Sequence, residues 1–302
     1  MNRQLQDLTA LLDLEPLERD LFRGQSRDLG GKSVFGGQVV GQALVAAGRT
    51  VEGQEAHSLH AYFLRPGDMA QPIVYEVDRV RDGRSFAARR VQAIQNGAAI
   101  LTLIASFQKR EPGLEHQAPM PQVAPPERLE SAHVLRRQWA DAQPDLHPRL
   151  REALMREVAI EFKPVTPWNP LAPEARAPFQ SWWIRAAGRL PDRDGAPDWA
   201  LHRAVLAYAS DFNFLSTAML PHGVSWFARD MVVASIDHAL WFHRDARADD
   251  WLLYSMDSPT AQGARGFSRG QVFDRQGRLV ASLAQESLMR KTSLSANTGP
   301  PS

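Results

Sequence analysis

The sequence predicts an α+β protein made of two repeats, in each of which a central helix is wrapped by a curved antiparallel sheet. Three observations lead to this prediction. Apolar residues recur at helical spacing in two segments, 34–50 and 199–219. Each of these segments is followed by about four stretches rich in β-branched and aromatic residues, with turn signals between them. The strand-like stretches of the two halves also resemble each other, which indicates an internal repeat.

The repeat is visible in two pairs of segments. LHAYFLR at 59–65 resembles DHALWFH at 237–243, and SFAARRVQAIQNGAAILTLIASF at 85–107 resembles GFSRGQVFDRQGRLVASLAQE at 266–286. We therefore divide the chain into an N-terminal repeat, a Pro-rich linker, a C-terminal repeat that carries the catalytic residues, and a disordered tail. The predicted bounds are 1–115, 116–150, 151–290 and 291–302.

The first repeat opens with leucines at helical spacing over 4–14, and Pro16 ends this short helix. A strand and turn follow over 17–31. The segment 34–50 keeps a helical stripe although it holds glycines that are costly in a helix, so we expect a helix closely covered by other backbone. Strands are predicted at 57–65, 72–83, 85–95 and 99–110.

The second repeat is preceded by a weakly helical stretch that becomes strand-like before residue 163. A strand at 180–188 and a continuous helix at 199–219 follow. The segment MVVASIDHALWFH (231–243) reads as one strand, in which Ser235 and Asp237 share a face and His238 lies on the other. The remaining strands are predicted at 251–259, 266–277 and 278–290.

Composition excludes several classes of function. The 302 residues are 44% hydrophobic, enough for a sizeable core, and the net charge of +1 provides no general attraction for nucleic acid or an anionic membrane. The absence of Cys excludes disulfides, thiolate metal sites and a Cys nucleophile. No run approaches the ~18 apolar residues of a membrane span, and the first residues lack a signal-peptide core. We expect a cytoplasmic protein without a membrane span or a nucleic-acid partner.

Seven motifs follow one another along roughly residues 10 to 290. They are FGGQVVGQALVAA (35–47), HSLHAYFLRPGD (57–68), VQAIQNG (91–97), LAYASDFNFL (206–215), ASIDHALWFHR (234–244), ARGFSRG (264–270) and LVASLAQESLMR (279–290). In this order they resemble the acyl-CoA thioesterase II family. The resemblance implies a double hotdog fold and hydrolysis of fatty acyl-CoA to free fatty acid and CoA, with no metal or other cofactor.

The resemblance also implies three catalytic residues. The family has an Asp on the second helix, a hydroxyl residue on the strand after it and a Gln on the last strand, and these motifs fall on Asp211, Ser235 and Gln285. The hydroxyl residue is Ser here, where the best-known members have Thr. Because Ser is not β-branched, it holds its side-chain rotamer less firmly than Thr.

Read without the family, two of these residues are polar groups on apolar surfaces. Asp211 lies on the apolar stripe of its predicted helix, where a carboxylate is costly unless it is bonded or functional. The alternative is a helix break near Ser210 with Asp211 as a cap. Gln285 shares a strand face with apolar residues, and a buried structural Gln is the alternative there. Ser235 alone is equally compatible with a structural role.

The repeat strengthens the case for one site per chain. The first helical segment contains no acidic residue, His57 stands at the position of Ser235, and Ser106 stands at the position of Gln285. Only the C-terminal repeat therefore has the complete set.

The mechanism we predict is direct attack by water, with Asp211 as general base and a backbone N–H at the start of the Gly-rich helix stabilising the oxyanion. The CoA phosphates need local cations. The candidates are Arg84, Arg89, Arg90, Arg265 and Arg269, which are equally compatible with a solvated strand face. Uncovered sheet faces and edges further predict a homo-oligomer, dimer or tetramer.

Two other patterns in the sequence are weaker. GFSRG matches a nucleophile elbow around Ser268, but that motif needs a helix after it and a strand pattern follows. His238 and His243 point to opposite faces of a strand, which favours structural hydrogen bonds over a metal site. Two other functions remain open: a hotdog enoyl-CoA hydratase and a non-catalytic acyl-CoA-binding protein.

Overall fold

The computed structural model describes residues 3–29 and 31–292. The tail predicted over 291–302 lies almost wholly outside these residues. The first repeat contains α1 (Arg3–Leu12), β1 (Glu15–Glu18), β2 (Leu21–Gly24), α2 (Gly36–Gly48), β3 (Glu55–Phe63), β4 (Ile73–Asp82), β5 (Phe86–Gln95) and β6 (Ala98–Gln108).

The rest of the chain begins with a connecting segment and then repeats the plan. Its elements are η1 (Pro126–Arg128), α3 (Ala132–Asp141), α4 (Pro148–Met155), β7 (Ile160–Pro164), β8 (Phe179–Ala186), β9 (Asp192–Arg193), β10 (Ala196–Pro197), α5 (Trp199–Ser210), α6 (Phe214–Met219), η2 (Leu220–His222), β11 (Met231–Ser235), β12 (Asp237–Phe242), β13 (Leu252–Gln262), β14 (Arg265–Phe273) and β15 (Leu279–Lys291).

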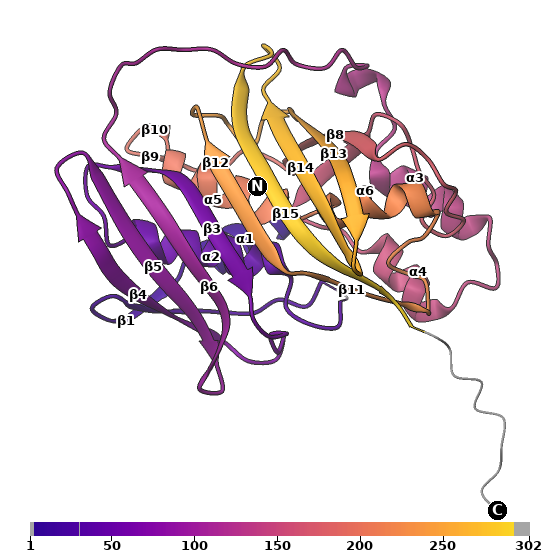
Figure 1. The fold of residues 1–302 in the computed structure, drawn as a ribbon, viewed down its shortest axis with the longest axis horizontal. Helices are drawn as coiled ribbons and strands as arrows, with labels where there is room; N and C mark the ends of the chain where they lie inside the picture. Colours follow the sequence, from indigo (N-terminus) through magenta and orange to yellow (C-terminus); the bar gives the residue numbers. More distant parts are fainter. Residues whose placement is uncertain (1–2, 30, 293–302) are drawn as a thin grey trace, which may run out of the picture.

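Thirteen strands form one antiparallel sheet, in which the strands of the second repeat follow the order of the first in reverse. The order is β1-β2-β4-β5-β6-β3-β12-β15-β14-β13-β8-β7, with β11 paired to β15, and the two repeats join where β3 pairs with β12. Figure 1 shows the purple and the orange–yellow halves meeting at these two strands. The predicted α+β plan with two repeats is confirmed, and the fold is a double hotdog.

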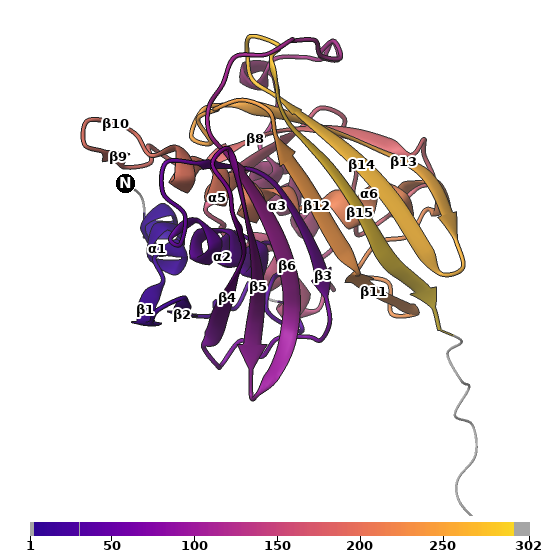
Figure 2. The same ribbon diagram turned by 60° about the vertical axis from the view of Figure 1, so that its left-hand side comes forward.

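Helices α2 and α5 pack against each other on one side of the curved sheet (Figures 1 and 2). Glycine makes their close approach possible. A Cβ on Gly37 would overlap the carbonyl oxygen of Tyr208, and a Cβ on Gly41 would lie 3.2 Å from the carbonyl oxygen of Ala204. The glycines that weaken α2 as an isolated helix are therefore the ones that fit it against α5, as the sequence indicated.

The prediction of a continuous helix over 199–219 was wrong. Helix α5 ends at Ser210 with Asp211 as its C-cap, and α6 begins at Phe214. Between them Asn213 adopts a left-handed conformation with φ of 61°. Asn tolerates this conformation better than most residues, so the local sequence permits the break.

The prediction of one continuous strand over 231–243 was also wrong. In β11, Ser235 pairs with Ser287, whereas in β12, Ala239 pairs with Ala284, so one extra residue lies on the β11–β12 side. This is a β-bulge at Ile236. Because a bulge shifts the alternation by one residue, Ser235 and His238 approach the same face although the sequence placed them on opposite faces.

The segment predicted as a linker, 116–150, is ordered and packed. It contains η1, α3 and the start of α4, and α3 lies against α4 and β7. Met120, Val123 and Leu129 pack on a small cluster of buried apolar side chains in the second repeat. In the described part of the chain, no helix is long and apolar enough to cross a membrane.

Candidate active site

Asp211 lies where the two repeats meet, at the end of α5 and against the start of α2. The Gly37 N–H donates to its Oδ2 at 3.0 Å, and the Ser235 hydroxyl donates to its Oδ1 at 3.2 Å. The N-terminal end of α2 carries partial positive charge and therefore stabilises the carboxylate. A Cβ on Gly36 would lie 2.7 Å from Oδ2, so this approach also needs glycine.

Gln285 and Ser235 continue the same chain of hydrogen bonds. The Gln285 side-chain amide donates from Nε2 to the Ser235 hydroxyl at 3.0 Å and to the Ser287 hydroxyl at 3.1 Å. Gln285 is 1% exposed on the inner face of β15. The three residues predicted from the sequence thus come together in one network, although they belong to three separate elements.

His238 is the member of this network that sequence reasoning did not assign to the site. It is fully buried, its Nδ1 lies 2.7 Å from Gln285 Oε1, and its Nε2 lies 2.8 Å from the Ser210 hydroxyl. Because Oε1 is an acceptor, Nδ1 donates to it, whereas the single Ser210 hydroxyl proton is shared between His238 Nε2 and the Ala207 carbonyl oxygen, 2.9 Å away. His238 therefore connects Gln285 back to the residue before Asp211. An alternating strand pattern gave no signal of this, because the bulge at Ile236 changes the face.

Tyr254 lies against the C-terminal end of α5. Its hydroxyl donates to the Ser210 carbonyl oxygen at 2.9 Å. Burial raises the pKa of Tyr254 well above its ordinary value, and the negative charge of Asp211 raises it further. Tyr254 is therefore a protonated donor that holds the break between α5 and α6, and it is not a base.

The arginines proposed for the CoA phosphates have different environments. Arg89 is 1% exposed and binds Thr50, the Arg81 and Ala88 carbonyl oxygens and Asp82. This environment argues against the prediction that Arg89 binds phosphate, because its guanidinium is buried and used within the protein.

Three more of the arginines are exposed and ion-paired on the outer sheet face. Arg90 pairs with Asp78, Arg265 with Glu286 and Arg269 with Asp257. Such exposed pairs contribute little to stability, and they leave a phosphate-binding role untested. Arg84, in the β4–β5 loop, forms no ion pair with another residue of the described chain.

The two weaker patterns are explained by their positions. Ser268 lies within β14, opposite Gln285 in the register, and the chain continues through a turn into β15. GFSRG is therefore not a nucleophile elbow, as predicted. His243 binds the Ser282 hydroxyl at 2.9 Å and shares no partner with His238. The two histidines therefore make separate hydrogen bonds.

A large cavity lies elsewhere. A cavity of about 950 Å³ is lined by the C-terminal end of α2 and the N-terminal end of α5, at the opposite end of the helix pair from Asp211. The candidate base, Asp211, lies outside this cavity. Hydrolysis needs a base beside hydrogen-bond donors, and the carboxylate, hydroxyl and amide meet there.

Fold and site together define a double hotdog protein in which a carboxylate, a hydroxyl and an amide are joined in one hydrogen-bonded network. Two family profiles match the chain: "Acyl-CoA thioesterase" over residues 156–288 and "Acyl-CoA thioesterase N-terminal domain" over residues 25–108. The two matches fall on the two repeats.

Known proteins agree with these profiles. Human acyl-coenzyme A thioesterase 8 is 44% identical over 94% of this chain and 88% of its own length. Acyl-CoA thioesterase 2 of Haemophilus influenzae is 40% identical over 96% of this chain and 99% of its own length. The structure of acyl-CoA thioesterase II TesB2 from Mycobacterium marinum is 39% identical with a TM-score of 0.76, covering 95% of this chain and 99% of that one. The chain belongs to the acyl-CoA thioesterase family and is a thioester hydrolase.

Proposed function

We propose that this protein hydrolyses fatty acyl-CoA to free fatty acid and CoA by direct attack of a water molecule activated at Asp211. The observation that carries the proposal is the network in which Asp211 is bonded to Gly37 and Ser235, and Ser235 to Gln285. Family membership favours hydrolysis over the hydratase and the non-catalytic alternatives.

The proposed step conserves atoms and charge. Asp211 accepts a proton from water as the water oxygen attacks the thioester carbonyl carbon. The tetrahedral intermediate then breaks its C–S bond, and the proton held by Asp211 passes to the departing CoA sulfur. Ser235 positions the water, Gln285 orients the Ser235 hydroxyl, and His238 keeps the Gln285 amide in one orientation.

The oxyanion of the intermediate needs donors that already point at it. The start of α2 supplies backbone N–H groups with the favourable helix dipole behind them. The Gly37 N–H is used by Asp211, whereas the neighbouring Gly36 N–H has no hydrogen bond to another described residue. We assign the oxyanion contact to Gly36.

A thiol-release assay over acyl-CoAs of increasing chain length tests this function. The chain has no Cys, so a thiol reagent reports only the CoA that is set free. We expect free thiol in proportion to substrate consumed. A hydrated acyl-CoA whose thiol stays masked would favour the hydratase, and tight binding without turnover would favour a binding protein.

We also propose a homo-oligomer, dimer or tetramer, assembled through the outer face of the sheet. Tyr62 and Ile104 are 56% and 51% exposed there, and the ring of His60 lies edge-on to Trp241 nearby. Exposed apolar side chains on neighbouring strands are typical of an interface. Light scattering should show more than one chain at micromolar concentration, and Ile104→Asp should shift the protein towards the monomer. A monomeric wild type would end this proposal.

For location we propose the cytoplasm, since a chain without cysteine suits a reducing compartment. Fractionation of the source cells with an antibody against the protein tests it, and recovery from an exported or organellar fraction would contradict it.

A further inference from the structure

The end of the α2–α5 helix pair opposite Asp211 holds the largest cavity named above. Its volume is about 950 Å³, within the range of small-molecule sites. It lies between α1, the last turn of α2, the first turn of α5 and the β9–β10 hairpin, which Figure 2 shows on the same side of the molecule. Apolar side chains line part of it: Leu44, Val45, Val51, Phe107 and Leu201.

Two polar atoms on residues that line this cavity are buried without a partner. They are Oε1 of Gln54, an acceptor, and Nε of Arg203, a donor. A buried polar atom without a hydrogen bond is costly, and each one in a native structure needs an explanation. Both atoms are enclosed by the wall of the cavity, so a ligand amide meets them only once these two side chains turn towards it.

A second cavity of about 590 Å³ shares Arg49, Val51 and Gln54 with the first. Its lining is basic, since four arginines face two acidic side chains. The residues are Arg49, Arg79, Arg84 and Arg89 against Glu52 and Asp82. Arg49, Arg79 and Arg89 pair with Asp13, Asp20 and Asp82. Arg84 forms no ion pair with another described residue, so one guanidinium remains for an anion. Guanidinium groups bind phosphate through paired N–H donors.

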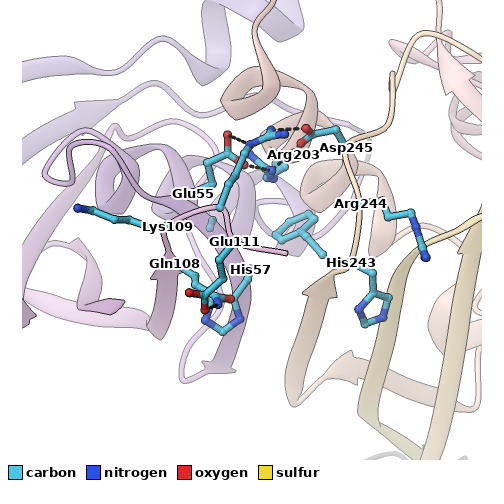
Figure 3. A pocket seen from close by; sticks show the side chains of 12 residues that line it. Glu55, His57, Gln108, Lys109, Glu111, Arg203, His243, Arg244 and Asp245 are labelled. Carbon is cyan, nitrogen blue, oxygen red and sulfur yellow. Dashed lines mark hydrogen bonds and ion pairs between the residues drawn. The ribbon is translucent and has the colours of Figure 1, made fainter. Parts of the chain in front are cut away.

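Most acidic side chains that line the large cavity are ion-paired. Asp13, Asp192 and Asp198 pair with Arg49, Arg247 and Arg193, whereas Asp194 forms no ion pair with another described residue. Figure 3 shows a smaller cavity of about 220 Å³, which shares Glu55 and Arg203 with the large one. Arg203 binds Glu55 at 2.7 Å and Asp245 at 2.6 Å, and Arg110 binds both acids as well. This four-residue cluster closes that side, so the basic side is the one suited to the charged end of a ligand.

We propose that the two joined cavities form a second, non-catalytic site for a CoA-type ligand. The amide-bearing arm and any acyl chain occupy the larger cavity, and the phosphates bind at Arg84 beside Arg49 and Arg79. The choice of CoA as the ligand class rests on the proposed function. Free CoA and intact acyl-CoA share this chemistry, and the experiment separates them.

The repeat explains why such a site binds without hydrolysing. At this end β3 carries the same one-residue bulge, since Ala56 pairs with Phe107 but Ser58 pairs with Ser106. His57, the residue at the bulge, binds the Ser106 hydroxyl at 2.8 Å, in the place of the Ser235–Gln285 bond. The C-cap of α2 is Arg49, whereas the C-cap of α5 is Asp211. The general base is therefore replaced by a cation.

The test measures CoA binding by titration calorimetry on the full chain. Gly48 lines the large cavity, and a Cβ there would have no neighbour nearer than 4.0 Å, so the side chain of Gly48→Leu starts in open space and narrows the cavity. Arg84→Glu reverses the unpaired charge. Arg137→Glu, on the exposed face of α3, is the control for charge reversal. Melting temperatures verify that each variant folds.

We expect two CoA molecules per wild-type chain and per Arg137→Glu chain, and one per Gly48→Leu or Arg84→Glu chain. Dodecanoyl-CoA, titrated into Asp211→Asn protein so that it stays intact, shows whether the site takes substrate as well as product. Pantetheine, which lacks the nucleotide phosphates, should lose the dependence on Arg84. One CoA per wild-type chain, unchanged by Gly48→Leu, would overturn the second site. If thiol release fails but Gly48→Leu still removes a bound CoA, the second site stands and the proposed hydrolysis does not.

Discussion

The two ends of the α2–α5 pair have the same scaffold and different chemistry. At each end, a bulged central strand brings a polar side chain into hydrogen-bonding distance of a residue on the adjacent strand. These bonds are Ser235–Gln285 at one end and His57–Ser106 at the other. At one end the helix C-cap is Asp211, and at the other it is Arg49, which binds Asp13 and the Leu14 carbonyl oxygen. The duplicated fold thus builds two similar ends of the helix pair, and single residues decide the chemistry that is possible at each end.

The helix N-termini differ in the same way. The N-cap of α5 is Asp198, whose side chain accepts from the Leu201 N–H. The N-cap of α2 is Phe35, which makes no side-chain cap bond. The cap of α5 satisfies one of its free N–H groups, whereas at the uncapped start of α2 the Gly37 N–H binds Asp211 and the Gly36 N–H has no partner among the described residues. The proposed active site therefore depends on the absence of a side-chain N-cap on α2.

The largest effect should come from removing the base. Asp211→Asn keeps the size of the side chain but cannot take a proton, so turnover should fall roughly 10²–10⁴-fold in the thiol-release assay. Acyl-CoA binding and melting temperature should change little, and the variant should melt slightly higher if the carboxylate is costly. Ser235→Ala and Gln285→Ala should each lower turnover less. Full activity in Asp211→Asn would sink the assignment, and loss of folded protein would assign Asp211 to a structural cap.

Substitution by Ala at Gly37 and at Gly48, the two ends of α2, should change the stability of the protein in opposite directions. Gly37→Ala places a methyl group on the Tyr208 carbonyl oxygen and should cost about 1–3 kcal/mol, as overpacking does. Gly48→Ala meets no atom nearer than 4.0 Å and should stabilise the helix by roughly 0.5–1 kcal/mol. Chemical denaturation measures both. Equal effects would mean that the close contact of α2 with α5 is not where the structure places it.

His238 should matter for rate more than for binding. His238→Leu removes the donor to Gln285, and the fall in kcat should be about fivefold with KM nearly unchanged, because one hydrogen bond is worth roughly 1 kcal/mol. His238→Asn keeps an N–H near the position of Nδ1 and should recover part of the loss. A merely structural His would instead lower stability in both variants without a change in kcat of the folded enzyme.

The smallest effect concerns pH and the His57 end. Burial lowers the pKa of His57 from its ordinary value of 6.5, so the folded protein disfavours the charged ring. The unfolded chain then binds more protons below about pH 6.5, and stability should fall as pH falls through that value towards the lowered pKa. His57→Gln should flatten this part of the stability profile, measured by melting temperature between pH 7.5 and 5. An unchanged slope would place the acid-sensitive group elsewhere; His243, whose pKa is also lowered by burial, is the comparison variant.

Much of this molecule was readable from residue patterns alone. Periodicity located the two central helices and the strands that surround them, and similarity between 59–65 and 237–243 predicted the repeat. Asp211, Ser235 and Gln285 were picked out because motifs carry them and because polar groups on apolar stripes are unusual. These signals are local, because apolar residues recur along a helix or a half-buried strand with the period of that element.

Tertiary structure decided the features that depend on pairing between distant segments. The break after Ser210 and the bulge at Ile236 both disturb regular patterns, and the bulge exists only relative to β15. Burial of Arg89 depends on Thr50 and Asp82 reaching it from other elements, and the double cavity depends on how α1, α2 and α5 meet. A side chain's neighbours across a sheet are set by register, and one residue of shift moves His238 from the opposite face into the network of Asp211.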